Sequence, residues 1–195
     1  MIVQTSRMVL RPVQRDDVAD LVRLDADPHV MRHVSGGLPT PRATIEDWVV
    51  PRAQAELQIG RGGIWVTIDR RYGEFFGWVS LRAPRHSRRP ELELSYRLRR
   101  EYWGRGLATE AARAVVDLAF TDLGAARVFA SASSTNTSSR RVIEKLGMRV
   151  SGIHVSDEHA IDGIGEVEYD LLREHWEIRA LRRRSAEAPS TDLTA

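Results

Sequence analysis

Cysteine is absent from the 195 residues of this sequence, and lysine is almost absent. Without cysteine the chain cannot form disulfides, thiolate metal sites or a covalent acyl-cysteine intermediate. Lys145 is the only lysine, so nearly every positive charge is carried by arginine. That bias can reflect codon composition and does not by itself indicate phosphate binding, although converging arginines bind phosphate well.

Long apolar runs and a strong net charge are also missing. No run approaches the ~20 apolar residues that cross a bilayer, and the opening "MIVQTSRMVLRP" lacks the apolar core of a secretory signal. We therefore expect a cytoplasmic protein with no membrane partner. A net charge of +2 is too small for a strong non-specific attraction to nucleic acid.

The sequence does contain the pattern of one mixed α/β domain. A hydrophobic content of 42% is enough for a single sizeable core. A short strand at about 8–11 precedes two helices, a hairpin within "GIWVTIDRRYGEFFGWVSLRAP" and a further strand, "PELELSYRL". A helix, a strand, a short helix closed by Gly147 and an antiparallel pair, "RVSGIHV" and "GEVEYDLLREHW", follow. We assign this domain to residues 1–184 and expect the small, polar segment 185–195 to be a disordered tail.

The stretch "EYWGRGLATEAA", residues 101–112, places Gly104 and Gly106 where a helix should begin. Each glycine costs a helix roughly 1 kcal/mol relative to alanine, so two of them need a reason. A strand, a glycine loop and a helix N-terminus together present free backbone N–H groups and a positive dipole end to an anion. The Arg105 guanidinium can add a pair of charged N–H donors to this anion site, and Thr109 can add a hydroxyl. The spacing fits neither common nucleotide loop, so this is either a different phosphate loop or a tight turn without a ligand.

A second polar stretch, "NTSSRRVIEKLGM", follows the next strand. Asn136 and Ser139 lie near the start of its helix, where their side chains can cap the free N–H groups. The alternative is that they hydrogen-bond an extended ligand that contains amides.

In this order the segments resemble the GNAT superfamily of acetyl-CoA-dependent N-acetyltransferases, in particular the branch with the ribosomal-protein alanine N-acetyltransferases. The resemblance covers about residues 5–178. It rests on "MVLRP" with "DPHVMRHV", "FFGWVSL", "ELELSYRL", "YWGRGLATEA", "NTSSRRVIEKLGM" and "LLREHW". Gly106 and Ala108 fill the small positions of the family loop pattern Q/R-x-x-G-x-G/A, whereas Trp103 stands where Gln or Arg is usual.

The resemblance implies a central mixed, mostly antiparallel sheet that is flanked by helices and splayed between its fourth and fifth strands. It also implies acetyl-CoA as co-substrate, with the pantetheine in the gap and the pyrophosphate on the loop amides. The cofactor-binding residues that it implies are Leu98, Gly104, Arg105, Gly106, Leu107, Ala108, Thr109, Asn136 and Ser139.

The implied reaction is acetyl transfer to a primary amine, on a protein N-terminus or a small molecule, directly in a ternary complex. Such a reaction needs a base for the amine and a group that stabilises the departing thiolate. Glu93 is the candidate base because enzymes of this branch use a carboxylate at this place. Glu91 lies on the same face by strand alternation and is the second candidate base. The alternative for both residues is that they are solvated glutamates at the strand edge with no catalytic role. Ser139 stands where many of these enzymes have a tyrosine acid, so it either protonates the thiolate or only hydrogen-bonds it.

The acceptor cleft is expected at about 28–45 and 155–165, where Asp157, Glu158 and Asp162 can attract a cationic amine. A non-catalytic module that binds acyl-CoA is the alternative function. A third interpretation is RNA or ribosome contact through "RHSRRP" and "RALRRR", but a solvated loop and helix end explain these runs more simply. The sequence leaves a homodimer open.

Two histidine pairs have spacings that metal sites use. His29 and His33 are i, i+4 on an expected helix, and "HVSDEH" contains His154 and His159. Neither has the further ligand context that a zinc site requires, so we expect no metal.

Overall fold

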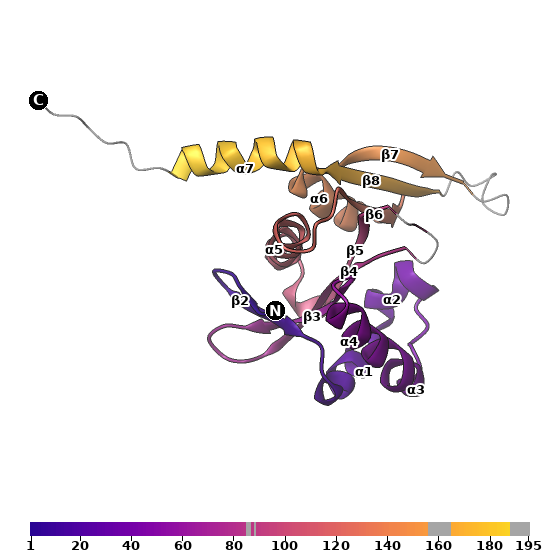
Figure 1. Cartoon of the computed structure of the whole chain (residues 1–195). Helices are drawn as coiled ribbons and strands as arrows, with labels where there is room; N and C mark the ends of the chain where they lie inside the picture. The colour runs from indigo at the N-terminus through magenta and orange to yellow at the C-terminus, as the bar shows by residue number, and fades with distance from the viewer. Residues whose placement is uncertain (85–86, 88, 156–164, 188–195) are drawn as a thin grey trace, which may run out of the picture.

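The computed structural model describes residues 1–84, 87, 89–155 and 165–187 of the chain (Figure 1). Its strands are β1 (Val3–Gln4), β2 (Met8–Pro12), β3 (Gly62–Asp69), β4 (Phe75–Arg82), β5 (Glu91–Leu98), β6 (Arg127–Ser133), β7 (Arg149–His154) and β8 (Glu166–Leu172). Its helices are α1 (Val18–Asp25), α2 (Pro28–Ser35), α3 (Arg42–Thr44), α4 (Val50–Gln58), α5 (Leu107–Thr121), α6 (Thr137–Leu146) and α7 (Arg173–Glu187), with the short turns η1 (Arg15–Asp17), η2 (Ile45–Val49) and η3 (Arg100–Tyr102).

All eight strands form one sheet in the order β1-β2-β3-β4-β5-β6-β8-β7. Every neighbouring pair is antiparallel except β5 and β6, which are parallel. The parallel pair needs a crossover, and α5 supplies it between the two strands. The mixed, mostly antiparallel sheet expected from the sequence is therefore confirmed.

The sheet splits between β5 and β6, its fourth and fifth strands once the two-residue β1 is set aside. The two strands pair only at Glu91↔Arg127, Leu92↔Val128 and Glu93↔Phe129, whereas β5 stays paired with β4 to its end. Arg127 secures the closed end of the split, because its guanidinium forms ion pairs with three carboxylates. Their nitrogen–oxygen distances are 3.1 Å to Glu91, 2.6 Å to Glu168 and 3.0 Å to Asp170.

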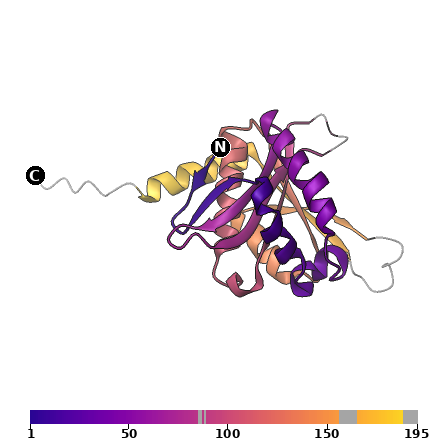
Figure 2. The same ribbon diagram turned by 90° about the horizontal axis from the view of Figure 1, so that it is seen from below.

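Helices cover both faces of this sheet (Figures 1 and 2). On one face α5 and α6 enclose the larger core, to which β5 contributes Leu94 and Leu98. On the other face α1 to α4 enclose a second core around residues such as Leu21 and Val66. Alternation along β5 therefore sends its even-numbered side chains toward α5 and α6 and its odd-numbered side chains toward α1 to α4.

The C-terminal end differs from the expected strand. The sequence predicts a strand through "LLREHW", but β8 ends at Leu172 and α7 begins at Arg173. A helix forms here because Trp176 can then stack on Phe120 of α5, with ring centroids 5.2 Å apart, and donate to Asp117 Oδ1 at 2.6 Å. Figure 1 shows α7 leaving the end of β8 and running outward.

Helix α7 continues to Glu187, past the expected start of the tail at Ser185, and residues 188–195 lie outside the described residues. Among the described helices, none combines the length and the apolar composition that crossing a membrane would need.

Candidate functional site

The loop between β5 and α5 owes its shape to two glycines. Gly104 and Gly106 have φ angles of +73° and +75°, the left-handed region that side chains other than glycine's rarely adopt. Gly106 occupies the N-cap of the fifteen-residue α5. Within the described residues, the amide N–H groups of residues 104–109 donate to no hydrogen-bond acceptor. The turn therefore presents a row of free donors at the positive end of a helix dipole, which is the arrangement that binds an anion.

Aromatic side chains hold this loop against the end of β5. The Trp103 indole donates to the Leu98 carbonyl oxygen at 2.8 Å, which gives this departure from the family's Gln or Arg a structural role. The Tyr102 hydroxyl donates to Glu74 Oε2 at 3.0 Å, and its ring lies 5.6 Å from the guanidinium of Arg105. Leu98 itself is buried at 5% exposure.

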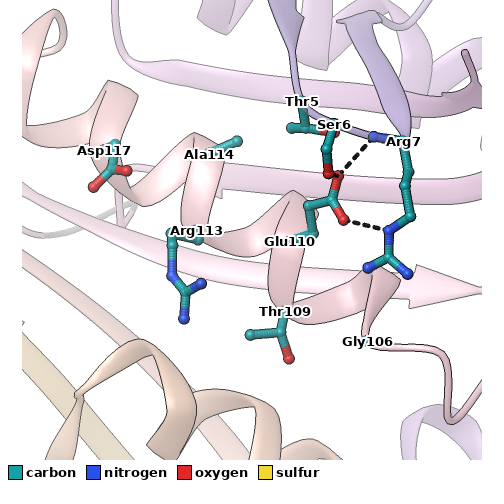
Figure 3. Close-up of a pocket in the computed structure, with 9 residues that line it drawn as sticks. All are labelled: Thr5, Ser6, Arg7, Gly106, Thr109, Glu110, Arg113, Ala114 and Asp117. Atoms are coloured by element: carbon teal, nitrogen blue, oxygen red, sulfur yellow. Dashed lines mark hydrogen bonds and ion pairs between the residues drawn. The ribbon is translucent and has the colours of Figure 1, made fainter. Parts of the chain in front are cut away.

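A clamp that the sequence analysis missed joins the turn between β1 and β2 to the start of α5 (Figure 3). Arg7 Nε lies 2.6 Å from Glu110 Oε2, and the Arg7 backbone N–H and Ser6 hydroxyl both donate to Glu110 Oε1 at 2.9 Å. Arg7 also donates to the Arg105 carbonyl oxygen at 2.8 Å, so it fixes the glycine loop directly. Burial opposes ionisation of Glu110, but the hydrogen bonds from Thr5, Arg7 and Ser6 prevail and lower its pKa to about 2. The carboxylate next to the loop is thus neutralised by its partners.

An open groove of about 410 Å³ lies along the same end of α5. Gly106, Thr109 and Arg113 line it together with the clamp (Figure 3). Arg113 is exposed and donates to the carbonyl oxygen of Lys145, at the end of α6. Arg113 therefore places a cation between α5 and α6, near the free amides.

The capping interpretation of Asn136 is confirmed. Its Oδ1 accepts from the Ser139 backbone N–H at 3.1 Å and from the Ser138 hydroxyl at 3.0 Å. Its carboxamide nitrogen donates to no acceptor among the described residues, so two N–H donors stay available at the start of α6.

Ser139 contacts a residue that the sequence analysis did not select, Tyr96 of β5. The Tyr96 hydroxyl lies 2.9 Å from Ser139 Oγ and 3.1 Å from the Ser139 carbonyl oxygen. Burial raises the pKa of Tyr96 to about 12, and the hydrogen bond with Ser139 works in the opposite direction. Strand alternation puts Tyr96 on the face of Leu94 and Leu98, but nothing in the sequence indicates that its hydroxyl reaches α6.

The two candidate bases have different surroundings although they share a face of β5. Glu91 accepts from the Ser87 hydroxyl at 2.5 Å and from Arg127 at 3.1 Å, and these partners, Ser87 foremost, lower its pKa. Glu93 forms no hydrogen bond or ion pair within the described part of the chain. It stands at the last β5–β6 pair, where the split begins.

Burial raises the pKa of Glu93, and the negative charges of Glu166 and Glu168 on β8 raise it further. Arg82, opposite Glu93 on β4, acts in the other direction. A half-buried carboxyl with a raised pKa and no partner in the described part of the chain is suited to take a proton.

The expected acceptor side is only partly described. Asp25, at 5% exposure, accepts from Arg97 at 2.8 Å and from Thr40 at 2.5 Å, which ties the loop after α2 to β5. The carboxylates proposed to attract a cationic amine lie outside the described residues: Asp157, Glu158 and Asp162.

The histidine pairs do not assemble a metal site among the described residues. His29 and His33 are exposed on α2. His154 lies 3.9 Å from Glu168, and its expected companion His159 lies outside the described residues.

Comparisons with known proteins bear on this geometry. Residues 7–149 match the acetyltransferase (GNAT) domain family. The chain is 31% identical over 186 residues to an FsC-acetyl coenzyme A-N(2)-transacetylase of Aspergillus fumigatus, covering 89% of this chain and 77% of that protein. It is 28% identical over 152 residues to a spermidine N(1)-acetyltransferase of Escherichia coli, covering 73% of each.

A solved structure of a ribosomal L7/L12 α-N-protein acetyltransferase in complex with coenzyme A shares the fold. The TM-score is 0.76 at 15% identity, over 90% of this chain and 99% of that one.

Proposed function

Because this chain belongs to the GNAT family of acetyltransferases, we propose that it transfers the acetyl group of acetyl-CoA to a primary amine, directly in a ternary complex. Membership makes it an N-acetyltransferase, and the resemblance inferred from its motifs is confirmed. The observation that supports the cofactor site is the row of free amides at residues 104–109, which lies beside the split in the sheet. Diphosphate is the anion that such a row of donors at a helix N-terminus fits.

In this proposal the loop amides of Gly104, Arg105, Gly106, Leu107, Ala108 and Thr109 bind the pyrophosphate. The pantetheine follows the β5 edge that β6 leaves open, up to Leu98. The free carboxamide nitrogen of Asn136 donates to a pantetheine carbonyl from the α6 side. Acetyl-CoA supplies an acetyl group activated as a thioester.

Glu93 and Ser139 carry the chemistry from opposite faces of β5. Glu93 takes the proton of the attacking amine on the side of α1 to α4, because its pKa is raised and no described residue binds its carboxylate. Ser139, on the side of α6, donates a hydrogen bond to the sulfur as negative charge develops there. Its contact with Tyr96 places this hydroxyl beside the split. The surroundings of Glu91, held by Ser87 and Arg127, favour Glu93 as the base.

The acceptor is a primary amine on a protein N-terminus or a small molecule. The relatives named above include a spermidine acetyltransferase and an acetyltransferase of a ribosomal protein. A purely regulatory acyl-CoA-binding module needs no base, so the raised pKa of Glu93, which has no partner within the described residues, favours an enzyme over that alternative.

The test has two stages. Calorimetry with acetyl-CoA measures cofactor binding, and release of free CoA thiol is then followed across a library of N-terminal peptides, polyamines and aminoglycosides, with mass spectrometry of the acceptor. With an acceptor found, Glu93→Gln is expected to lower kcat by ~10²–10⁴-fold, the usual contribution of a general base, and to leave acetyl-CoA affinity nearly intact.

The loss should shrink at high pH, where more of the amine is already neutral. Full activity of Glu93→Gln across the pH range would remove this residue from the mechanism. Failure of the wild-type protein to bind acetyl-CoA would overturn the proposed function.

A further inference from the structure

Tyr96 lies where the split between β5 and β6 has opened. It follows Glu93, the last β5 residue that pairs with β6. Its ring packs against the core beneath α5, and its hydroxyl crosses to α6 and ends 2.9 Å from Ser139 Oγ. A half-buried phenol on a strand thus contacts the one side chain that the proposed function places against the leaving sulfur.

The position of one proton decides what Ser139 can do. The phenol has a single proton, and both Ser139 oxygens are within its reach, Oγ at 2.9 Å and the carbonyl oxygen at 3.1 Å. If the phenol donates to the carbonyl oxygen, the Ser139 hydroxyl donates its own proton back to Tyr96. If the phenol donates to Oγ, the Ser139 proton is free to point into the split.

We propose that Tyr96 is a positioning residue of the transferase, whose phenol donates to Ser139 Oγ and thereby turns the Ser139 proton toward the sulfur of CoA. This inference rests on the proposed function. In the transfer, the bond between the amine nitrogen and the acetyl carbon forms and the carbon–sulfur bond breaks, with its electron pair leaving on sulfur. The amine proton passes to Glu93. Tyr96 and Ser139 keep their protons and stabilise the thiolate until solvent protonates it.

The surroundings of Tyr96 favour such a donor over a proton relay. Burial raises the pKa of the phenol to about 12, so it remains protonated at neutral pH and is always able to donate. The backbone of Ser139 is held independently, because its N–H donates to the Asn136 cap at 3.1 Å. Because this cap does not involve Tyr96, loss of the phenol should change the direction of the hydroxyl proton more than the course of the helix, although its contact with the Ser139 carbonyl oxygen is lost as well.

The test compares the binding of CoA with that of desulfo-CoA, at a pH above the pKa of the CoA thiol. Calorimetry on the wild-type protein is expected to show a preference for CoA of about tenfold or more, the size of a hydrogen bond to a charged group. Tyr96→Phe keeps the ring and removes the donor, so it should lose most of this preference and leave desulfo-CoA affinity unchanged. Ser139→Ala should lose it too, and the double variant should be no worse than Ser139→Ala.

Tyr169→Phe is the matched control. Its hydroxyl also reaches α6, where it accepts from Arg140 Nε at 2.8 Å, but it does not contact Ser139. This variant should keep the preference for CoA. In turnover, Tyr96→Phe should lower kcat about tenfold at an unchanged KM for acetyl-CoA, because its role is confined to the departing sulfur.

Three outcomes would overturn the inference: no preference for CoA in the wild-type protein, an intact preference in Tyr96→Phe, or an equal loss in Tyr169→Phe. A wild-type protein that binds neither CoA nor desulfo-CoA would instead overturn the proposed function. The two failures are therefore distinguishable.

Discussion

Glu91 and Glu93 show how the surroundings of a residue set its chemistry. Both are glutamates on the same face of β5, so pattern alone cannot separate them. Ser87 and Arg127 hold Glu91 as a carboxylate that closes the split, whereas Glu93 has a raised pKa and no hydrogen-bond or ion-pair partner among the described residues. Two carboxyls whose pKa values are shifted in opposite directions usually have different roles.

Arg82 provides a prediction at this scale. Burial and the carboxylates of Glu166 and Glu168 on β8 raise the pKa of Glu93, whereas the positive charge of Arg82 lowers it. Arg82→Gln should therefore raise the pKa of Glu93. Since Glu93 must be deprotonated to act as a base, the acid limb of the kcat/KM profile should move to higher pH, with activity recovered on the alkaline side.

Arg23→Gln is the control, because Arg23 is an exposed cation on α1 that pairs with Asp20 at 3.0 Å. Its pH profile should match that of the wild-type protein. An acid limb that stays in place in Arg82→Gln, or moves to lower pH, would contradict the role given to Glu93.

At the scale of elements, the glycine loop can be tested against a turn of the same backbone geometry. Gly106→Val and Gly73→Val both put a side chain at a φ near +75°, and neither added Cβ meets an atom closer than 3.6 Å. Both should lose stability by about 1–2 kcal/mol. Only Gly106→Val should weaken acetyl-CoA binding, by at least tenfold or about 1.4 kcal/mol, because only its side chain lies among the amides proposed to bind the pyrophosphate.

Thermal unfolding and calorimetry on the two variants make this comparison. Equal acetyl-CoA affinity for both folded variants would argue against residues 104–109 as the phosphate site.

The clamp between Arg7 and Glu110 predicts a pH dependence of stability. The pKa of Glu110 is about 2 in the folded protein and 4.5 for an ordinary glutamate, so the native state favours the carboxylate. The stabilisation is complete above the unfolded value and is lost as the pH falls from 4.5 toward 2. Because Arg7 is half exposed, the contribution is about 1–2 kcal/mol.

Thermal unfolding of the wild-type protein and Glu110→Gln as a function of pH measures this contribution. The variant should be less stable at neutral pH, and the difference should shrink in acid. A constant difference between the two proteins would show that Glu110 does not carry the effect.

Local patterns predicted most elements because the information lies within a few residues. The strands alternate, Gly147 ends α6 with a φ of +88°, and the two loop glycines indicated a special turn. The strand predicted through "LLREHW" was wrong beyond Leu172, because the helix that replaces it depends on Trp176 packing on Phe120, which is distant in sequence.

The same limit applied to the site. The contact of Tyr96 with Ser139 joins residues 43 positions apart, and that of Arg7 with Glu110 joins residues 103 positions apart. No spacing rule reaches across such separations, so the sequence indicated the glycine loop but neither the side chains that hold it nor the contact between Tyr96 and Ser139.

For the whole molecule, the small net charge makes salt dependence informative. With a net charge of +2 there is little general attraction for an anionic cofactor, so any salt effect on CoA binding must come from local arginines. Arg105 and Arg113 are the exposed candidates beside the loop. We expect CoA binding to weaken as ionic strength rises, and dephospho-CoA to bind more weakly and with a smaller salt dependence.

Calorimetry over a salt series compares the two ligands, and Arg23→Gln again serves as a distant charge control. Equal affinities that do not change with salt would mean that backbone amides and pantetheine contacts alone hold the cofactor.

The short β5–β6 junction also has a consequence for how the molecule opens. Within the sheet, strands β1 to β5 and strands β6 to β8 meet through a ladder that ends at Glu93↔Phe129 and through the ion pairs of Arg127, while α5 packs a shared core against both halves. Amide hydrogen exchange along the facing edges of β5 and β6 beyond this ladder should therefore be faster than in β3 and β4, which pair along their lengths. A ligand lying in the split would supply the hydrogen bonds that β5 and β6 do not make to each other. Its binding should therefore slow amide hydrogen exchange in both strands together.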